Sequence, residues 1–165
     1  MAQTVHLALK IDGNDIVGES DATSLDRADT IECSSFKYML VSPREGSTGR
    51  LTGKRQHKPV KITKRVDQTT PLLLKALCKN EMCDEANFMF YRPSVDTGGA
   101  EEKYYTVKLE NGYVSGVSQL SEDAIMAGES APPMMEEVSF VFQTITWTYE
   151  KNGATHVDTT TGEDG

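Results

Sequence analysis

The side chains that most often perform catalysis occur in this chain without forming a catalytic set. The three histidines are expected in separate settings, with His6 and His156 solvated and His57 inside a basic loop. The acidic pairs at 101–102 and 136–137 are adjacent, so in extended chain their carboxylates point to opposite faces and are poorly placed as a cooperating acid and base. The sequence therefore predicts no catalytic residues and no enzyme.

Patterns for phosphate and metal binding are also missing. The segment from Gly46 to Arg55 contains Gly-Lys, but Arg follows where a phosphate-binding loop needs Ser or Thr, and no helix is expected to begin there. Cys78 and Cys83 are separated by four residues, which is not a usual zinc spacing, and no calcium-loop alternation is present. We expect no cofactor, no metal and three reduced thiols.

The most distinctive chemical feature is a concentration of positive charge. Seven of the 17 Lys and Arg residues lie between Gly46 and Val66, a window without Asp or Glu, which leaves ten for the rest of the chain against 25 acidic residues. The net charge of −8 argues against general binding to nucleic acid or an anionic membrane. A basic segment on an acidic body favours association with other copies, and a head-to-tail contact generates a ring or a filament.

Three interpretations of the basic window are open on composition alone. It can be a solvated loop followed by an edge strand that lysines protect from aggregation. It can be an arm for nucleic acid, although no aromatic side chain lies within it to stack on a base. It can be a contact between subunits, which explains both the long loop and the acidic surface elsewhere. An alternative function is a small β-barrel binding module that grips an anionic ligand with its basic loop.

The elements that must position these residues are mostly strands. Period-two alternation predicts strands at 5–11, 31–41, 60–66, 86–92, 104–117 (bent or bulged after 109) and 138–149 (one strand or two). One helix is expected, with Thr70 as its N-cap, Pro71 in its first turn and its end near Lys79. This pattern predicts a mainly β fold, an antiparallel barrel or sandwich with one helix on one side.

Two long connections interrupt the strands. The first runs from about 42 to 59 and holds the first half of the basic window, and the second is acidic and runs from Ser118 to Glu137. In the strand between them we expect the basic side chains to point outward: Lys61, Lys64 and Arg65.

Length and the chain ends complete the sequence-based predictions. A chain of 165 residues predicts one domain, at 1–157, with fraying from Asn152 and a flexible tail at 158–165. No apolar run approaches the length of a membrane span, and the N-terminus lacks the regions of a cleaved export signal. We expect synthesis in the cytoplasm and, if the protein leaves, a route that does not read such a signal.

Two segments of the chain, from Gly53 to Pro71 and from Phe142 to Tyr149, carry a resemblance that spans about residues 4–157. They resemble the Hcp family, the haemolysin-coregulated proteins that form the inner tube of the bacterial type VI secretion system. Many members carry a Trp in the second strand, where this chain has Phe36 and Tyr38, so packing is expected to differ there. The family-motif positions are Thr63, Lys64, Asp67, Thr70, Pro71, Trp147 and Tyr149.

The resemblance implies a fold, an antiparallel β-barrel with one flanking α-helix and an extended loop, and a mechanical role. Members form a homohexameric ring, and rings stack into a tube inside a contractile sheath, with a spike at the tip. It implies secretion without a cleaved signal, no nucleic-acid partner, no membrane insertion and a lumen that can hold small effector proteins. It also implies that the long loop contacts other subunits and rings. The expected contact residues are Arg44, Arg50, Leu51, Thr52, Lys54, Arg55, His57 and Lys58.

Overall fold

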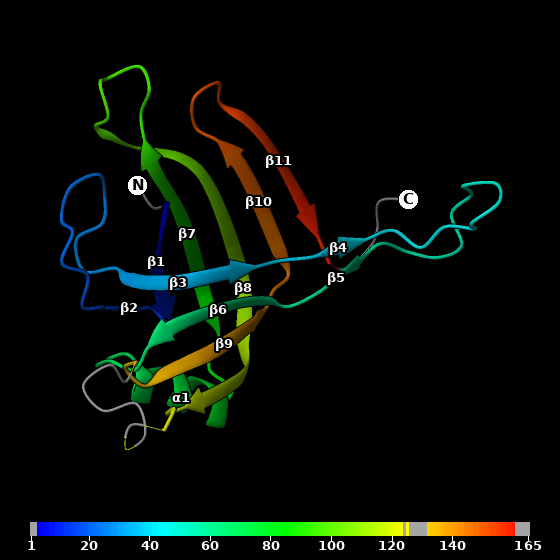
Figure 1. The fold of residues 1–165 in the computed structure, drawn as a ribbon. Coiled ribbons are helices and arrows are strands. Elements are labelled where there is room, and N and C mark those ends of the chain that lie inside the picture. Colours follow the sequence, from blue (N-terminus) through cyan, green and yellow to red (C-terminus); the bar gives the residue numbers. More distant parts are fainter. Residues whose placement is uncertain (1–2, 124, 126–131, 161–165) are drawn as a thin grey trace.

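The structure confirms a mainly β fold with a single helix in the part of the chain that it describes. The computed structural model describes residues 3–123, 125 and 132–160 (Figure 1). The elements are β1 (Thr4–Ile11), β2 (Asn14–Ile16), β3 (Ile31–Lys37), β4 (Leu40–Val41), β5 (Gln56–His57), β6 (Val60–Arg65), α1 (Thr70–Cys78), β7 (Cys83–Pro93), β8 (Glu101–Leu120), β9 (Met135–Val141), β10 (Thr144–Tyr149) and β11 (Ala154–Thr159).

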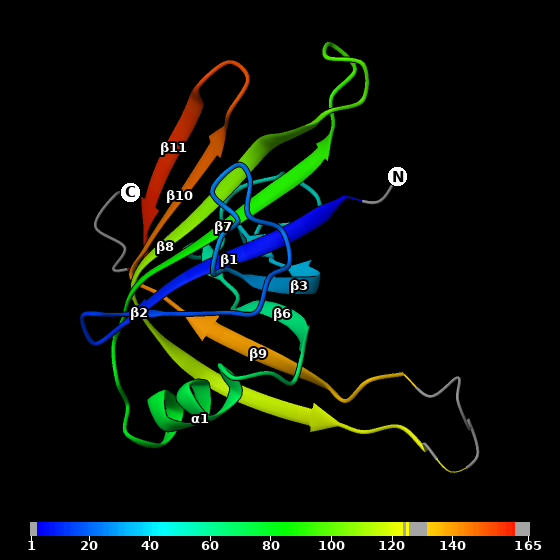
Figure 2. The same ribbon diagram turned by 90° about the vertical axis from the view of Figure 1, so that its left-hand side faces the viewer.

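Six of the strands close into an antiparallel barrel, which is one of the two architectures that the alternation favours and the one that the family resemblance implies. Their order is β8-β7-β1-β3-β6-β9, and β9 returns to pair with β8. The helix packs against β8 at one end of this barrel (Figure 2). The strands β10 and β11 extend the sheet beyond the barrel, because β10 pairs with β8 and β11 pairs with β10.

The longest strand, β8, joins these two parts of the sheet. Residues 105–110 of β8 pair with β10, and residues 113–120 pair with β9, so β9 and β10 follow one another along the same edge. Asn111, at the junction, adopts a left-handed backbone with φ of 52°. A Cβ added to Gly112 would lie 2.3 Å from the Val141 carbonyl oxygen, so only glycine fits there. The bulged continuation of this strand is confirmed, and 138–149 is two strands.

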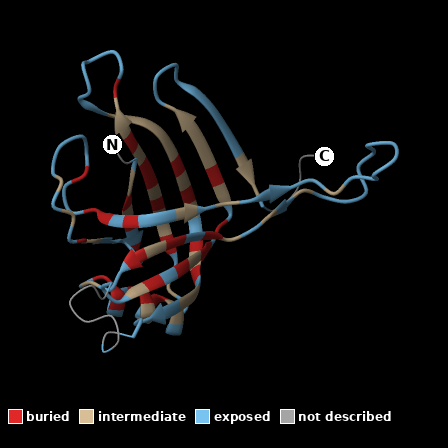
Figure 3. Ribbon diagram, viewed as in Figure 1, coloured by how far each residue is buried: buried red, intermediate tan, exposed pale blue. Residues whose placement is uncertain are grey.

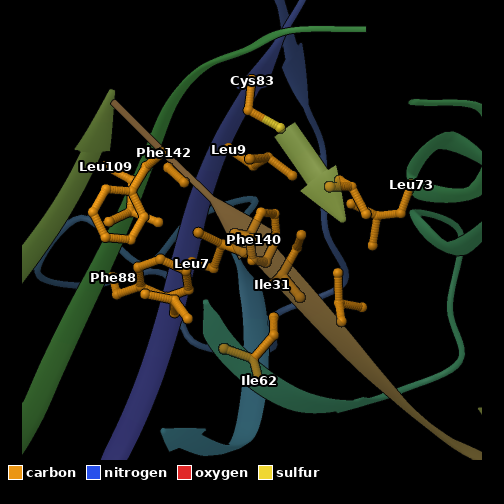
Figure 4. Packing of buried hydrophobic residues seen from close by; sticks show 14 of the residues in the cluster. Leu7, Leu9, Ile31, Ile62, Leu73, Cys83, Phe88, Leu109, Phe140 and Phe142 are labelled. Carbon is orange, nitrogen blue, oxygen red and sulfur yellow. The ribbon is translucent and has the colours of Figure 1, made fainter. Parts of the chain in front are cut away.

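The core lies inside the barrel, where side chains from alternate strand positions meet. Leu7 and Leu9 of β1, Phe88 of β7 and Phe140 of β9 are almost inaccessible to solvent (Figure 4). Leu73 closes one end from the helix. Burying a side chain of this size contributes about 1.5–3 kcal/mol. In Figure 3 buried bands alternate with less buried ones along β6 and β9, with the period of two on which the strand predictions rest.

Several local predictions were wrong. The N-cap position is Thr69, without a side-chain cap hydrogen bond, and the hydroxyl of Thr70 donates inside the fold to Glu136 Oε1 at 2.7 Å. The ring of His6 is buried, with its Nδ1 3.0 Å from Thr30 Oγ1, and burial lowers its pKa. The tail expected to fray instead forms β11 at Ala154–Thr159, whereas residues 161–165 lie outside the described residues.

The three cysteines are free thiols, as predicted. The acidic connection is shorter than predicted, because β8 continues to Leu120 and β9 begins at Met135, and part of it (124 and 126–131) lies outside the described residues. None of the helices in the described ranges is long and apolar enough to cross a bilayer.

Candidate subunit-contact arm

The long basic loop forms an arm, defined here as residues 40–58, that projects away from the barrel (Figure 1). Its root is a two-stranded ribbon in which Leu40 faces His57, and an isolated bridge between Arg44 and Leu51 continues the ribbon outward. Gly49 takes a left-handed φ of 71° in the reversal at the tip. The arm is therefore an extended hairpin.

Six of the eight residues expected to make subunit contacts lie exposed along this arm. They are Arg44, Arg50, Leu51, Thr52, Lys54 and Lys58. Leu51 is 61% exposed near the tip, and Leu40 and Val41 at the root are 41% and 36% exposed. The arm thus presents apolar side chains among positive charges.

The other two, Arg55 and His57, turn back toward their own chain and contact Asp158 of β11. Arg55 binds the carboxylate in two places, with Nε 2.7 Å from Oδ2 and Nη2 2.6 Å from Oδ1. His57 Nε2 lies 2.7 Å from Oδ2, and its Nδ1 lies 2.6 Å from the Tyr38 hydroxyl. The side chain of His57 is only 5% exposed, so this histidine of the basic loop is turned inward. We call Tyr38, Arg55, His57, Trp147 and Asp158 the arm-root cluster.

The electrostatics of the arm-root cluster follow from these contacts. Hydrogen bonds from the Arg55 guanidinium lower the pKa of Asp158 to about 2, and the bond from His57 acts in the same direction. A carboxylate only accepts, so His57 Nε2 carries the proton in this contact, and the other ring nitrogen lies within hydrogen-bond distance of the Tyr38 hydroxyl. Burial, together with the nearby Asp158 charge, raises the pKa of Tyr38 to about 12.

Aromatic packing holds the same histidine in place. The Trp147 ring stacks on His57 with an interplanar angle of 18° and on His156 with an angle of 6°. Phe142 meets the His57 ring edge-on at 5.5 Å between centroids. The family-motif Trp147 is therefore a packing partner of the arm root, and Tyr38 fills part of the same space.

The motif residues around Lys64 form a second cluster, at the opposite end of the barrel from the arm-root aromatics. Lys64 is fully buried and its Nζ lies 2.5 Å from Glu136 Oε1 and 2.9 Å from Asp67 Oδ1. Thr70 lies within 3.4 Å of the same nitrogen. Burial raises the pKa of Asp67, but hydrogen bonds from Thr69 and Lys64 outweigh it and leave this pKa lowered. We call Lys64, Asp67, Thr70 and Glu136 the buried ionic cluster.

The buried ionic cluster overturns one prediction. Lys64 was expected to point outward with Lys61 and Arg65, and only those two neighbours are exposed. Residues 60, 62 and 64 share one face of β6, so the alternation itself places Lys64 inside with Val60 and Ile62. A lysine that shares the inner face of a strand with apolar residues indicates a buried acidic partner, because lysine is almost never fully buried unless it is paired.

The remaining motif positions serve the fold. Thr63 lies half-buried in β6 between β3 and β9, and Pro71 begins the helix. Tyr149 accepts a hydrogen bond of 3.0 Å from Arg92 and so links β10 to β7.

Two carboxylates central to these clusters were not identified from sequence. Glu136 shares the inner face of β9 with Val138 and Phe140, so the same alternation signal applies to it. Asp158 carries no such signal, because its partners lie about a hundred residues away in the chain. Among the described residues, no group of His, Cys, Asp and Glu side chains is arranged to hold a metal ion.

Comparison with known proteins places the chain in a family. A family model described as "Type VI secretion system effector, Hcp" matches residues 9–149. The "Major exported protein" of Pseudomonas aeruginosa PAO1 is 34% identical over 130 residues, which cover 79% of this chain and 74% of that protein.

Solved structures agree with this assignment. A variant of Hcp1 from E. coli EAEC 042 superposes with a TM-score of 0.81 at 34% identity, covering 96% of this chain and 99% of that chain. The secreted protein Hcp3 of Pseudomonas aeruginosa gives a TM-score of 0.75 at 25% identity, covering 96% and 98%. The fold, the motif positions and these matches have one reading: the chain belongs to the Hcp family of type VI secretion proteins and is a structural tube subunit.

Proposed function

We propose that this tube subunit assembles as a homohexameric ring, that the rings stack into the inner tube, and that the arm makes contacts between copies. The arm itself carries this proposal. A two-stranded ribbon is at best marginally stable in water, so an arm of this kind needs a surface to rest on. The apolar side chains that it leaves exposed, Leu40, Val41 and Leu51, would be buried on a neighbouring subunit.

Charge complements this apolar contact. The arm holds Arg44, Arg50, Lys54 and Lys58 in exposed positions, whereas the chain as a whole has a net charge of −8. Exposed ion pairs contribute only about 0–1 kcal/mol each, so apolar burial would set the strength of the contact. The charges would select its register and its partner surface.

The wider role follows from the family. The contractile sheath and the spike proteins are the proposed partners of the stacked tube, and small effector proteins are the proposed cargo of its lumen. Assembly would take place in the bacterial cytoplasm. Secretion would follow as part of the fired tube, without a cleaved signal peptide.

The oligomeric state tests the ring directly. Native mass spectrometry is expected to give a species at six times the subunit mass of 18.2 kDa, and electron microscopy is expected to show rings. A chain that stays monomeric at all concentrations would contradict the ring. If that monomer bound nucleic acid with a steep salt dependence, the binding-module alternative would replace it.

An arm-shortened variant tests the contact. Replacing residues 45–50 with Asn-Gly keeps the root of the arm and removes its tip. We expect a folded protein that no longer stacks. Shortening the loop at 95–99 between β7 and β8 by the same number of residues is the matched control and should leave stacking unchanged. Normal stacking by the arm-shortened protein would remove the arm from the assembly.

A charge test complements the shortening. Arg50→Glu with Lys54→Glu reverses two exposed charges but leaves Arg55, which binds Asp158, in place. We expect weaker stacking, with a smaller difference from the wild type at high salt, because salt screens exposed charges. Light scattering as a function of salt concentration measures both effects.

A further inference from the structure

The arm is attached to a strand that does not belong to the closed barrel. In the described part of the chain, β11 pairs with β10 alone and forms the outer edge of the extended sheet. Its residue Asp158 nevertheless binds Arg55 and His57 of the arm. The last described strand thus reaches the element that is proposed to contact other subunits.

The contact at Asp158 is oriented and partly shielded from solvent. The carboxylate side chain is 12% exposed and accepts two bonds from the Arg55 guanidinium and one from His57. A two-point bond between guanidinium and carboxylate fixes direction as well as distance. The stacked Trp147 ring limits the positions that His57 can take.

We propose that Asp158 is a positioning residue that sets the direction of the arm, so that presentation of the arm depends on the C-terminal strand β11. The consequence for assembly rests on the proposed role of the arm as a contact between copies. The structural statement about Asp158 does not.

Because β11 lies outside the barrel, the contact between Asp158 and the arm can open without unfolding of the barrel. Opening β11 breaks its pairing with β10 and leaves the six barrel strands paired. Edge elements open locally at a lower free energy than the whole domain unfolds. The arm can therefore change between a fixed and a free state while the barrel stays folded. A fixed arm loses less conformational entropy on association than a free one.

Asp158→Asn is the direct test. The two side chains have nearly the same shape, but the amide nitrogen of Asn donates and would face donors from Arg55 or His57. Hydrogen exchange of the full-length protein, read by mass spectrometry, should show about tenfold faster exchange of the amides at 40–41 and 56–58, which corresponds to the loss of a charge-assisted bond. Exchange in β7 and β1 should stay unchanged.

The single Trp supplies a second, local measurement. Trp147 stacks on His57, and the chain has no other Trp, so its fluorescence reports on the arm root. We expect a shift to longer wavelength in Asp158→Asn as the ring becomes more exposed. A change limited to overall stability would not move this signal in the folded protein.

Two further variants serve as controls. Asp96→Asn removes an exposed ion pair with Lys151, beside the turn that connects β10 and β11, and should leave exchange in the arm and the Trp147 emission as they are. Asp158→Glu keeps the charge and should restore a large part of the protection.

The outcomes separate the two proposals. Wild-type exchange at 40–41 and 56–58 in Asp158→Asn would overturn the positioning role of Asp158, whatever the variant does in assembly. Faster exchange there together with normal tubes would leave the positioning role standing and would contradict the arm as an assembly contact. Faster exchange with impaired stacking would support both.

Discussion

The two halves of the basic window place their charges in opposite surroundings. Lys64, in the barrel strand β6, is fully buried and pairs with Glu136, which is buried as well. Arg55, at the arm root, is 30% exposed and pairs with Asp158 at the edge of the molecule. Both pairs are close contacts between opposite charges, but only the pair of Lys64 and Glu136 is fully shielded from solvent.

This difference separates two uses of an ion pair. Taking two charges out of water costs several kcal/mol per ion, so a buried pair persists only when each partner is well bonded. Lys64 and Glu136 meet this condition through Asp67, Thr70 and Gln119. A peripheral pair contributes little to global stability but fixes the orientation of a projecting segment. The buried ionic cluster therefore affects the stability of the barrel, whereas the arm-root cluster affects the orientation of the arm.

Removing the buried cation should have the largest effect. Lys64→Ala leaves Glu136 buried without its ionic partner, and we expect the free energy of unfolding to fall by about 3–5 kcal/mol. Denaturant titration followed by circular dichroism measures this loss. A decrease below about 1 kcal/mol, within the range of exposed ion pairs, would show that the two clusters do not differ.

A double substitution distinguishes lost attraction from an unpaired charge. Lys64→Met together with Glu136→Leu removes both charges and keeps side-chain volume, so most of the stability is expected to return. Asp67 and Thr70 keep their contact with each other through the backbone amide of Asp67. A double variant as unstable as Lys64→Ala would mean that the buried ionic cluster stabilises the barrel through attraction.

Removing the peripheral cation should have a smaller effect on the barrel. Arg55→Gln is expected to lower the free energy of unfolding by about 1 kcal/mol or less. The same variant should loosen the arm, which the exchange of amides at 56–58 measures. A loss as large as that of Lys64→Ala would assign the arm root to the core of the fold.

Acid should release the arm through Asp158, with an effect limited to the arm root. The pKa of Asp158 is lowered from 3.8 to about 2, so its contribution is complete above pH 4 and is lost as the pH falls from about 4 toward 2. Arg55 stays charged throughout this window. We expect a transition of Trp147 fluorescence there in the wild type that is absent in Asp158→Asn.

The sequence predicts the barrel well and the clusters poorly, for a physical reason. Strand alternation is a local property, so the strands and their buried faces follow from it, as β6 and β9 illustrate. The charge of Lys64 favours an outward position, but the alternation of β6 places this residue on the inner face, and the structure agrees with the alternation. Asp158 depends on a contact across about a hundred residues, which no local pattern encodes. The resemblance to the family predicts the extended loop, but it does not predict that Arg55 and His57 point back toward Asp158 of the same chain.

The shared strand β8 also has a consequence for how the chain folds. It pairs with β7, which precedes it closely, but also with β9 and β10, which follow a long connection. Barrel closure further joins β6 to β9 and β1 to β7, and the paired residues are about seventy to ninety positions apart in the chain. Folds dominated by such distant pairings reach the native state in about milliseconds to seconds, whereas helical bundles of similar size take about microseconds to milliseconds. Folding of the subunit is thus a slow step that precedes its association with other copies. During this step, newly synthesised chains expose unpaired strand edges.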